Sequence, residues 1–240
     1  MRILAFGAHP DDIEFQTAGT LAKYAKQQGN EIFMAIATNG NIGSFRHTKE
    51  QIAAIRHKEA QKSADLIGAK LIWMDYEDEF LFDNKDTRLK FVDVVRIAQP
   101  DVMFAHEPYK DYNQDHNITG WLAFIARVLS VIKLIETEHP PCKKVPALFY
   151  YTTLGIINFV PEYYVDITDT WEVKKKMWLC HDSQQGDWCR DAFGVSYNEM
   201  MEAESALLAV QAGTPSCRYA EGFKLCKGWP TIAGAYKLLP

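Results

Sequence analysis

The sequence predicts an α/β protein with a Rossmann-like, mostly parallel sheet and helices on both faces. Short apolar runs alternate with longer helical stretches from Ile3 to Ala105. Two of the helical stretches end at Gly29 and Gly68, where glycine readily adopts the left-handed conformation that closes a helix. This alternation is typical of parallel strands joined by crossover helices. Because no repeat or low-complexity linker interrupts the chain, we expect one domain over residues 1–240, with an elaborated C-terminal third.

The predicted elements follow one another in a regular order. Strands are expected over residues 3–6, 31–37, 70–74 and 101–105, with helices over 20–28, 49–67 and 89–98 between them. Beyond Gly120 we expect a helix over 121–136, strands over 145–151 and 164–167, and a helix over 171–179. Pro140 and Pro141 prevent the first of these helices from continuing, because proline lacks the backbone N–H that a helix needs.

Composition and charge argue against several partners. Lys and Arg number 26 against 31 Asp and Glu, a net charge of -5 that disfavours nucleic acid. The longest apolar stretch, 121–135, contains Arg127 and Lys133 and is shorter than the ~20 residues that a bilayer requires, so no membrane contact is expected. The five cysteines form no C-x-x-C pair and favour a reducing compartment, and the first residues lack a signal-peptide core. We therefore expect a cytoplasmic protein.

Two polar segments at predicted strand ends carry the residues best suited to chemistry. His9-Pro10-Asp11-Asp12-Ile13-Glu14 packs an imidazole and three carboxylates together, which is costly without a cation. Asp115-His116 follows the fourth strand, and open α/β sheets bind ligands where loops leave the carboxyl ends of strands. His9, Asp12 and a ligand from Asp115-His116 would make a catalytic zinc or iron site with an open position. Asp11, beside these ligands, could then take a proton from water.

A turn followed by an acidic helix start would also explain His9-Pro10-Asp11-Asp12, because Asp and Glu favour the positive end of a helix dipole. The second polar segment, placed at another strand end of the same sheet, favours the metal site over this simpler interpretation.

Several further motifs resemble those of the PIG-L/LmbE-like deacetylases. Besides His9-Pro10-Asp11-Asp12-Ile13-Glu14 they are Ala18-Gly19-Thr20-Leu21, Thr38-Asn39-Gly40-Asn41-Ile42-Gly43, Arg56-His57-Lys58-Glu59-Ala60, Gln114-Asp115-His116 and Tyr219-Ala220-Glu221-Gly222-Phe223. The resemblance covers most of the chain. It implies a Rossmann-like fold and zinc-dependent hydrolysis of an N-acetyl group, usually on a glucosamine-like sugar. It also implies that His9, Asp12 and His116 bind zinc and that Asp11 is the general base.

The chain departs from the family pattern at one position. The family commonly reads His-Pro-Asp-His where this chain reads Asn113-Gln114-Asp115-His116, so the histidine thought to protonate the leaving amine is replaced. Asn113 can donate a hydrogen bond to an oxyanion but cannot pass a proton. We place Asn113 and Asp115 with Asp11 among the catalytic residues. His181 is the spare proton donor, although a histidine at a helix end is more often a cap.

Five residues are predicted to contact the substrate: Asn39, Gly40, Arg56, Asp78 and Tyr109. The resemblance places the first two at the rim of the pocket and matches Arg56 to an arginine that holds sugar hydroxyls. Asp78 and Tyr109 lie in loops that follow the third and fourth strands. A turn, a solvated helix charge or a surface loop would also account for these residues.

We therefore expect a zinc-dependent hydrolase that removes an N-acetyl group from an N-acetylglucosamine-like amino sugar or its conjugate. Fe²⁺ is the alternative metal, because two histidines and an aspartate accept it equally by ligand type. A noncatalytic metal- and sugar-binding protein is the alternative function, owing to Asn113. A nucleotide-binding module is disfavoured, because Gly7-Ala8-His9-Pro10 lacks the G-x-G-x-x-G pattern. The aromatic residues of the last third, among them Tyr151, Trp178 and Trp188, suggest a homo-oligomer interface or a core.

Overall fold

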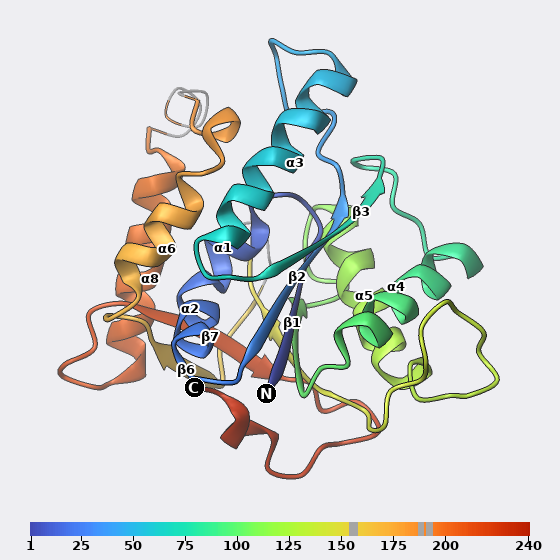
Figure 1. Ribbon diagram of the computed structural model, residues 1–240. Coiled ribbons are helices and arrows are strands. Elements are labelled where there is room, and N and C mark those ends of the chain that lie inside the picture. The colour runs from blue at the N-terminus through green and yellow to red at the C-terminus, as the bar shows by residue number, and fades with distance from the viewer. Residues whose placement is uncertain (154–157, 187–189, 191–193) are drawn as a thin grey trace.

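A seven-stranded sheet crosses the molecule in the order β3-β2-β1-β4-β5-β7-β6 (Figure 1). The computed structural model describes residues 1–153, 158–186, 190 and 194–240. Its strands are β1 (Arg2–Gly7), β2 (Glu31–Thr38), β3 (Lys70–Tyr76), β4 (Val102–His106), β5 (Ala147–Tyr151), β6 (Tyr163–Asp166) and β7 (Ala220–Leu225). Strands β1 to β5 pair in parallel, whereas β7 pairs antiparallel with both β5 and β6. The predicted α/β class with a mostly parallel sheet is confirmed.

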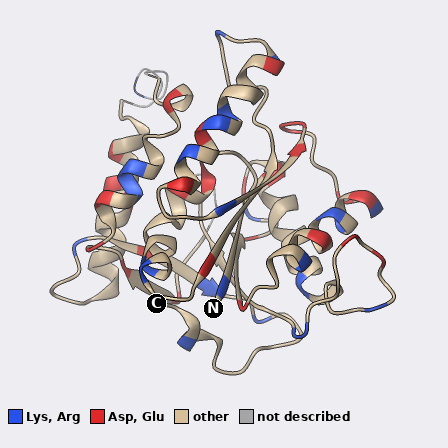
Figure 2. Cartoon of the chain, in the orientation of Figure 1, with Lys and Arg blue, Asp and Glu red and all other residues tan. Residues whose placement is uncertain are grey.

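Helices cover both faces of this sheet (Figure 1). One face carries α1 (Asp12–Gln16), α2 (Ala18–Lys26), α3 (Lys49–Asp65), α6 (Trp171–Trp178) and α8 (Tyr197–Ala212), and the other carries α4 (Lys85–Ala98) and α5 (Gln114–Leu129). Two 3₁₀ turns, η1 (Asp182–Gln184) and η2 (Ala235–Leu238), follow α6 and precede the C-terminus. Along α3, acidic and basic residues lie beside one another (Figure 2). No helix in the described part of the chain is both long and apolar enough to cross a bilayer.

The helix predicted over 121–136 is α5, and the prediction was wrong at both ends. The helix begins at Gln114 because the Asn113 side chain caps it, accepting hydrogen bonds from the backbone N–H groups of Asp115 and His116. It ends at Leu129. Beyond that point the chain leaves the helical path, and its carbonyl groups at Ser130, Ile132 and Ile135 accept hydrogen bonds from the buried Arg96 guanidinium of α4. The earlier start brings His116 into the first turn of a helix.

The order of the strands places the loops after β1 and β4 side by side. The chain moves from β1 to β2 on one side and later returns to lay β4 on the other side of β1. Loops that leave the two strands on either side of such a reversal open a crevice at the carboxyl ends of the strands. The segment that contains His9 and the segment that contains His116 border this crevice, although 107 residues separate the two histidines.

The sequence did not predict β7, because this strand contains a glutamate and a lysine. Glu221 is only 1% exposed, and its carboxylate accepts a hydrogen bond from Lys174 Nζ of α6 at 2.7 Å. The same carboxylate accepts from the backbone N–H groups of Gly19 and Thr20 at the start of α2. A buried charge is tolerated only when it is paired in this way. The ion pair therefore joins β7, α2 and α6.

Replacing Glu221 with alanine should lower the free energy of unfolding by about 3–5 kcal/mol, because Lys174 would stay buried without a partner. Urea denaturation followed by circular dichroism measures this change. The Glu162→Ala variant is the control: it removes an exposed pair with Lys227 and should cost less than about 1 kcal/mol. An equally small loss for Glu221→Ala would show that the buried pair does not hold the three elements together.

Candidate metal centre

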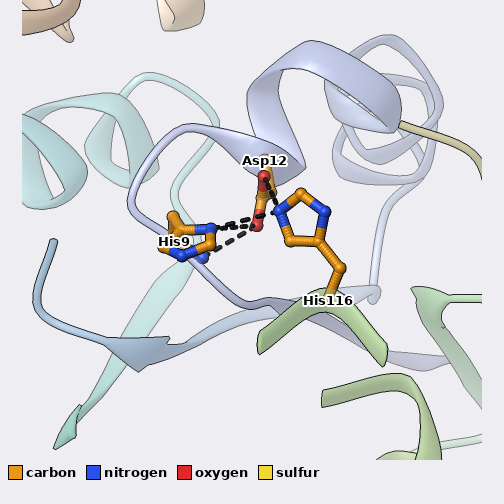
Figure 3. A group of neighbouring side chains, drawn as sticks. All are labelled: His9, Asp12 and His116. Carbon is orange, nitrogen blue, oxygen red and sulfur yellow. Dashed lines mark hydrogen bonds and ion pairs between the residues drawn. The ribbon is translucent and has the colours of Figure 1, made fainter. Parts of the chain in front are cut away.

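Three side chains that could bind a metal converge in the crevice between β1 and β4 (Figure 3). His9 follows β1, Asp12 is the first residue of α1, and His116 lies in the first turn of α5. One ligand atom from each residue lies within 4.8 Å of the others. His9 Nδ1 and His116 Nε2 are 3.1 Å apart, and Asp12 Oδ1 lies 3.4 Å from His116 Nε2. Two imidazole nitrogens and a carboxylate form the donor set of an open catalytic site.

The outer nitrogens of both imidazole rings face carboxylates. His116 Nδ1 lies 3.0 Å from Asp111 Oδ2, and His9 Nε2 lies 3.0 Å from Asp78 Oδ1 and 3.5 Å from Asp115 Oδ2. A carboxylate at this distance favours a proton on the outer nitrogen, so each ring presents the lone pair of its inner nitrogen to the other. Such histidine–carboxylate pairs are the usual second layer of a metal site.

Two lone pairs 3.1 Å apart repel unless positive charge lies between them. Burial lowers the pKa of His116, but Asp12 and Asp111 raise it more, to about 9. Burial likewise opposes the charged form of His9, and Asp115, Asp12 and Asp78 together raise its pKa well above the ordinary value. The surrounding carboxylates therefore favour positive charge at this position. A divalent cation, held by the same donors, fits this requirement.

His106, the last residue of β4, contacts two of the candidate metal ligands. Its ring stacks on that of His116, with centroids 4.4 Å apart, and its Nε2 lies 3.1 Å from Asp12 Oδ2. Burial lowers the pKa of His106 to about 4, so its ring is neutral. Burial opposes the ionised form of Asp12, yet His116 and His106 hold the pKa of this carboxyl well below its usual range. Asp12 is therefore a carboxylate, as a metal ligand must be.

Asp11 lies next to the three ligands in a strained conformation. Its φ is 155° and its ψ is −22°, outside the regions that residues with a Cβ normally adopt. The Arg56 guanidinium holds it there, donating to Asp11 Oδ2 at 2.9 Å and to the carbonyl oxygen of Pro10 at 3.0 Å. Burial raises the pKa of Asp11, and Arg56 opposes part of that rise. Strain of this kind is concentrated at functional sites.

A cavity of about 230 Å³ opens over these side chains. Its described lining consists of His9, Asp11, Asp12, Phe15, Gln16, Arg56, Tyr112, Asn113, His116, Thr153, Trp178, Gln184 and Tyr197. The lining therefore combines the candidate metal ligands with the amide side chains of Gln16, Asn113 and Gln184 and with an aromatic cluster. In this cluster Phe15 packs edge-on against Trp178 and Tyr197. A small concave site with a few convergent polar groups is typical of small-molecule binding.

Of the five predicted substrate-binding residues, only Arg56 lines this cavity. Gly40, at φ +64°, makes room for Arg56 instead: a Cβ there would lie 2.4 Å from the guanidinium. Asn39 donates to Asp75, and Tyr109 packs against Trp121. The buried Asp78 contacts the outer nitrogen of His9. Asn39, Gly40, Asp78 and Tyr109 therefore lie near the cavity but are not part of its described lining.

The four predicted catalytic residues are also distributed unequally. Asp11 and Asn113 line the cavity. Asp115 is fully buried below it, where its carboxylate accepts from the backbone N–H groups of Glu79 and Leu81 and contacts His9. His181 is fully buried too, with its Nε2 3.1 Å from Glu14 Oε1, and it does not reach the cavity wall. Asp115 and His181 therefore contact neighbouring protein groups and are not part of the described cavity lining.

Sequence reasoning did not predict that Asp111 contacts His116 or that Trp178 and Tyr197 line the cavity, and among the residues of the loop before α5 it selected Tyr109 over Tyr112. The first had a usable signal, since a carboxylate five residues before a ligand histidine, in the loop that enters its helix, can fold back onto the ring. Tyr112, which follows Asp111 in the sequence, lines the cavity, whereas Tyr109, the tyrosine that was predicted to do so, does not. The two aromatic residues from α6 and α8 had no such signal, because only the packing of these helices brings them to the cavity.

Comparison with known proteins gives matches over most of the chain. A family model described as PIG-L, GlcNAc-PI de-N-acetylase, matches residues 4–126. The diacetylchitobiose deacetylase of Thermococcus kodakarensis is 28% identical over 239 residues, covering 95% of this chain and 84% of the relative. A 4-oxalmesaconate hydratase of Pseudomonas putida is 25% identical over 197 residues, covering 77% and 74%. The solved N,N'-diacetylchitobiose deacetylase from Pyrococcus horikoshii superposes with a TM-score of 0.80 at 28% identity, covering 93% and 83%.

We expect one divalent metal ion per chain at His9, Asp12 and His116. Purified His9→Ala and His116→Ala proteins should lose at least about nine-tenths of their metal, because removing one of three ligands should lower the affinity for the metal by more than about tenfold. Atomic emission analysis after dialysis measures the metal, and circular dichroism verifies the fold. His47→Ala, an exposed histidine outside the cavity, should retain the full content. Full metal in both ligand variants would contradict the assignment.

Proposed function

The chain belongs to the PIG-L family of de-N-acetylases, and on that basis we propose that it is a metal-dependent hydrolase that removes the N-acetyl group from an N-acetylglucosamine-like amino sugar or its conjugate. Its relatives include deacetylases that act on amide bonds. The observation that carries the proposal is the position of Asp11 beside His9, Asp12 and His116 in one cavity. A base next to a metal centre is the arrangement that hydrolysis of an amide requires.

The residues of the cavity divide the reaction between them. His9, Asp12 and His116 would hold a divalent cation, which when bound would supply Lewis-acid chemistry for a carbonyl group and for water. Asp11 accepts the proton from the attacking water and returns it to the departing amine nitrogen. Arg56 holds the Asp11 carboxylate in place by the contact at 2.9 Å.

Asn113 is in place to donate a hydrogen bond to the developing oxyanion. Its Oδ1 accepts from the backbone at the start of α5, which fixes the direction of the amide. One proton of Nδ2 is donated to Glu79 Oε1 at 2.8 Å, which leaves the second N–H for the cavity that Asn113 lines. An oriented amide donor stabilises negative charge in the transition state even though it transfers no proton.

The proposal also covers the identity of the metal, the oligomeric state and the cellular location. We propose zinc, with Fe²⁺ as the alternative, because the donor set suits both ions. A homo-oligomer remains a prediction. Tyr151 and Trp178 are buried in the core, and Trp188 lies outside the described residues, so these three aromatic residues do not support it. A cytoplasmic location also remains a prediction, supported by the unpaired cysteines of the described chain.

An Asp11→Asn protein should keep its metal and lose at least about a hundredfold in kcat, because an amide occupies the same space but accepts no proton. Acetate release from N-acetylglucosamine or diacetylchitobiose gives the rate, and metal analysis gives the occupancy. Asp169→Asn, which changes an exposed carboxylate on the surface, is the matched control. Loss of metal together with activity would make Asp11 a ligand.

The role of Asn113 can be separated from its structural contacts. Asn113→Asp keeps the acceptor that caps α5 but removes the N–H, and it should lower kcat by about a hundredfold, the cost of one oxyanion donor. Adding Glu79→Gln restores the hydrogen bond between the two side chains with donor and acceptor exchanged. We expect the double variant to regain stability in thermal unfolding and not to regain kcat. Recovery of kcat would show that only the contact with Glu79 matters.

Acetate release also tests the function itself. A metal-loaded wild-type protein that releases no acetate from a panel of N-acetylglucosamine derivatives would favour the noncatalytic sugar-binding alternative. Hydration of an unsaturated acid, suggested by the relative named 4-oxalmesaconate hydratase, should be assayed with the same preparation.

A further inference from the structure

Two glutamines line the same cavity as the metal centre, and the protein fixes the direction of both amide groups. Gln16 Nε2 donates to Glu204 Oε2 at 3.2 Å. Gln184 Nε2 donates to the carbonyl oxygen of Gly43 at 3.2 Å and to Ser183 Oγ at 3.0 Å. Ser183 Oγ uses its own proton for Glu59 at 2.6 Å, so it can only accept from Gln184. Because these partners are acceptors, each glutamine must turn its NH₂ group toward them.

The atoms that the glutamines keep for a ligand are therefore their carbonyl oxygens. Neither Gln16 Oε1 nor Gln184 Oε1 has a hydrogen-bond donor among the described residues, and neither is an oxygen sealed away from solvent. A carbonyl oxygen accepts a hydrogen bond from a ligand hydroxyl or amine. The same oxygen repels a carboxylate or phosphate oxygen, which brings no proton to share.

Away from the metal centre, the described wall offers an anion little positive charge. Arg56 is its one Lys or Arg side chain; the two terminal nitrogens already donate to Asp11, Pro10 and Gly40, and the unpartnered Nε is buried. Residues 154–157, 187–189 and 191–193 include no Lys, Arg or His in the sequence. Behind the wall lie further carboxylates, Glu204 against Gln16 and Glu79 against Asn113. Arg46 and His47 line a separate adjoining groove that shares Gln184.

We propose, on the basis of the proposed deacetylase function, that Gln16 and Gln184 make this cavity specific for uncharged, hydroxyl-rich N-acyl sugars and exclude sugars that carry a phosphate or carboxylate group on the ring. The two oxygens accept hydrogen bonds from ring hydroxyls, while Phe15, Trp178 and Tyr197 provide apolar wall for the sugar carbons. An anionic substituent that lies away from the metal centre would meet acceptor oxygens and carboxylates, with no Lys or Arg of the described lining except the paired Arg56, so it should bind more weakly than a hydroxyl in the same place.

The first test compares N-acetylglucosamine with N-acetylglucosamine 6-phosphate as substrates of the metal-loaded wild-type protein. We expect kcat/KM for the phosphorylated sugar to be lower by at least about tenfold. Equal or higher kcat/KM for the phosphorylated sugar would overturn the proposal.

The second test changes the charge of the wall. Gln184→Lys places a cation beside the adjoining groove and should narrow the difference between the two sugars by at least about tenfold, through better use of the phosphorylated sugar. Gln61→Lys is the matched control, because it makes the same change at an exposed position of α3 outside the cavity, and it should leave the difference unchanged. An equal change in both variants would assign the effect to net charge and overturn the role of Gln184.

Binding measurements keep this proposal distinct from the proposed function and from any failure of a variant to fold. Calorimetric titration of the metal-loaded wild-type protein compares glucosamine with glucosamine 6-phosphate, and inorganic phosphate alone reports anion binding to the metal. If no acetate is released from any sugar, the deacetylase function fails, yet tighter binding of glucosamine would still support the specificity. Tighter or equal binding of glucosamine 6-phosphate, after allowance for inorganic phosphate, or binding of neither sugar, would overturn it.

Discussion

The approach of two imidazole nitrogens to 3.1 Å is the contact on which the rest of the site depends. Two lone pairs at that distance require positive charge between them, and the surrounding residues are arranged to keep that requirement in place. Asp111, Asp78 and Asp115 face the outer nitrogens, so neither ring can turn its lone pair away without losing a carboxylate contact. Asp12 adds the negative charge that makes a divalent ion more favourable than a single proton.

Contacts from several surrounding elements fix the positions of the residues in this cluster. Asp115 ties the loop at Glu79 and Leu81 to the start of α5, and Asn113 caps the same helix, so His116 sits on a fixed turn. On the other side of the crevice, Arg56 stabilises the strained backbone at Asp11, and Gly40 leaves the space that the guanidinium fills. Of the predicted substrate contacts, Arg56, Gly40 and Asp78 are therefore parts of the frame around Asp11 and His9. Asn39 and Tyr109 contact other residues.

The cavity above this frame combines two kinds of wall. One is polar, and hydrogen bonds fix the orientation of each of its polar side chains. Asp11 contacts Arg56, and Asn113 contacts the start of α5 and Glu79. Gln16 donates to Glu204, and Gln184 donates to Gly43. The other kind of wall is aromatic: α1, α6 and α8 contribute Phe15, Trp178 and Tyr197. A site with fixed hydrogen-bonding directions discriminates between ligands by which donors and acceptors they carry, because an unmatched buried group is costly.

The sequence alone was enough to predict the class of fold, six of the strands and the residues that meet at the metal centre, because these depend on local features. Apolar runs and glycine ends mark buried strands and the helices between them, and an imidazole beside carboxylates at a strand end is unusual without a cation.

The start of α5 and the existence of β7 could not be predicted in the same way. The first depends on the cap that Asn113 provides, and the second on a glutamate whose charge is met by Lys174 from another helix. Only the tertiary structure decided that Asp78 and Asp115 contact His9, that His181 is buried against Glu14, and that Gln16 and Gln184 donate to Glu204 and Gly43. These roles depend on which distant acceptor each side chain meets, and packing, not sequence spacing, determines such partners.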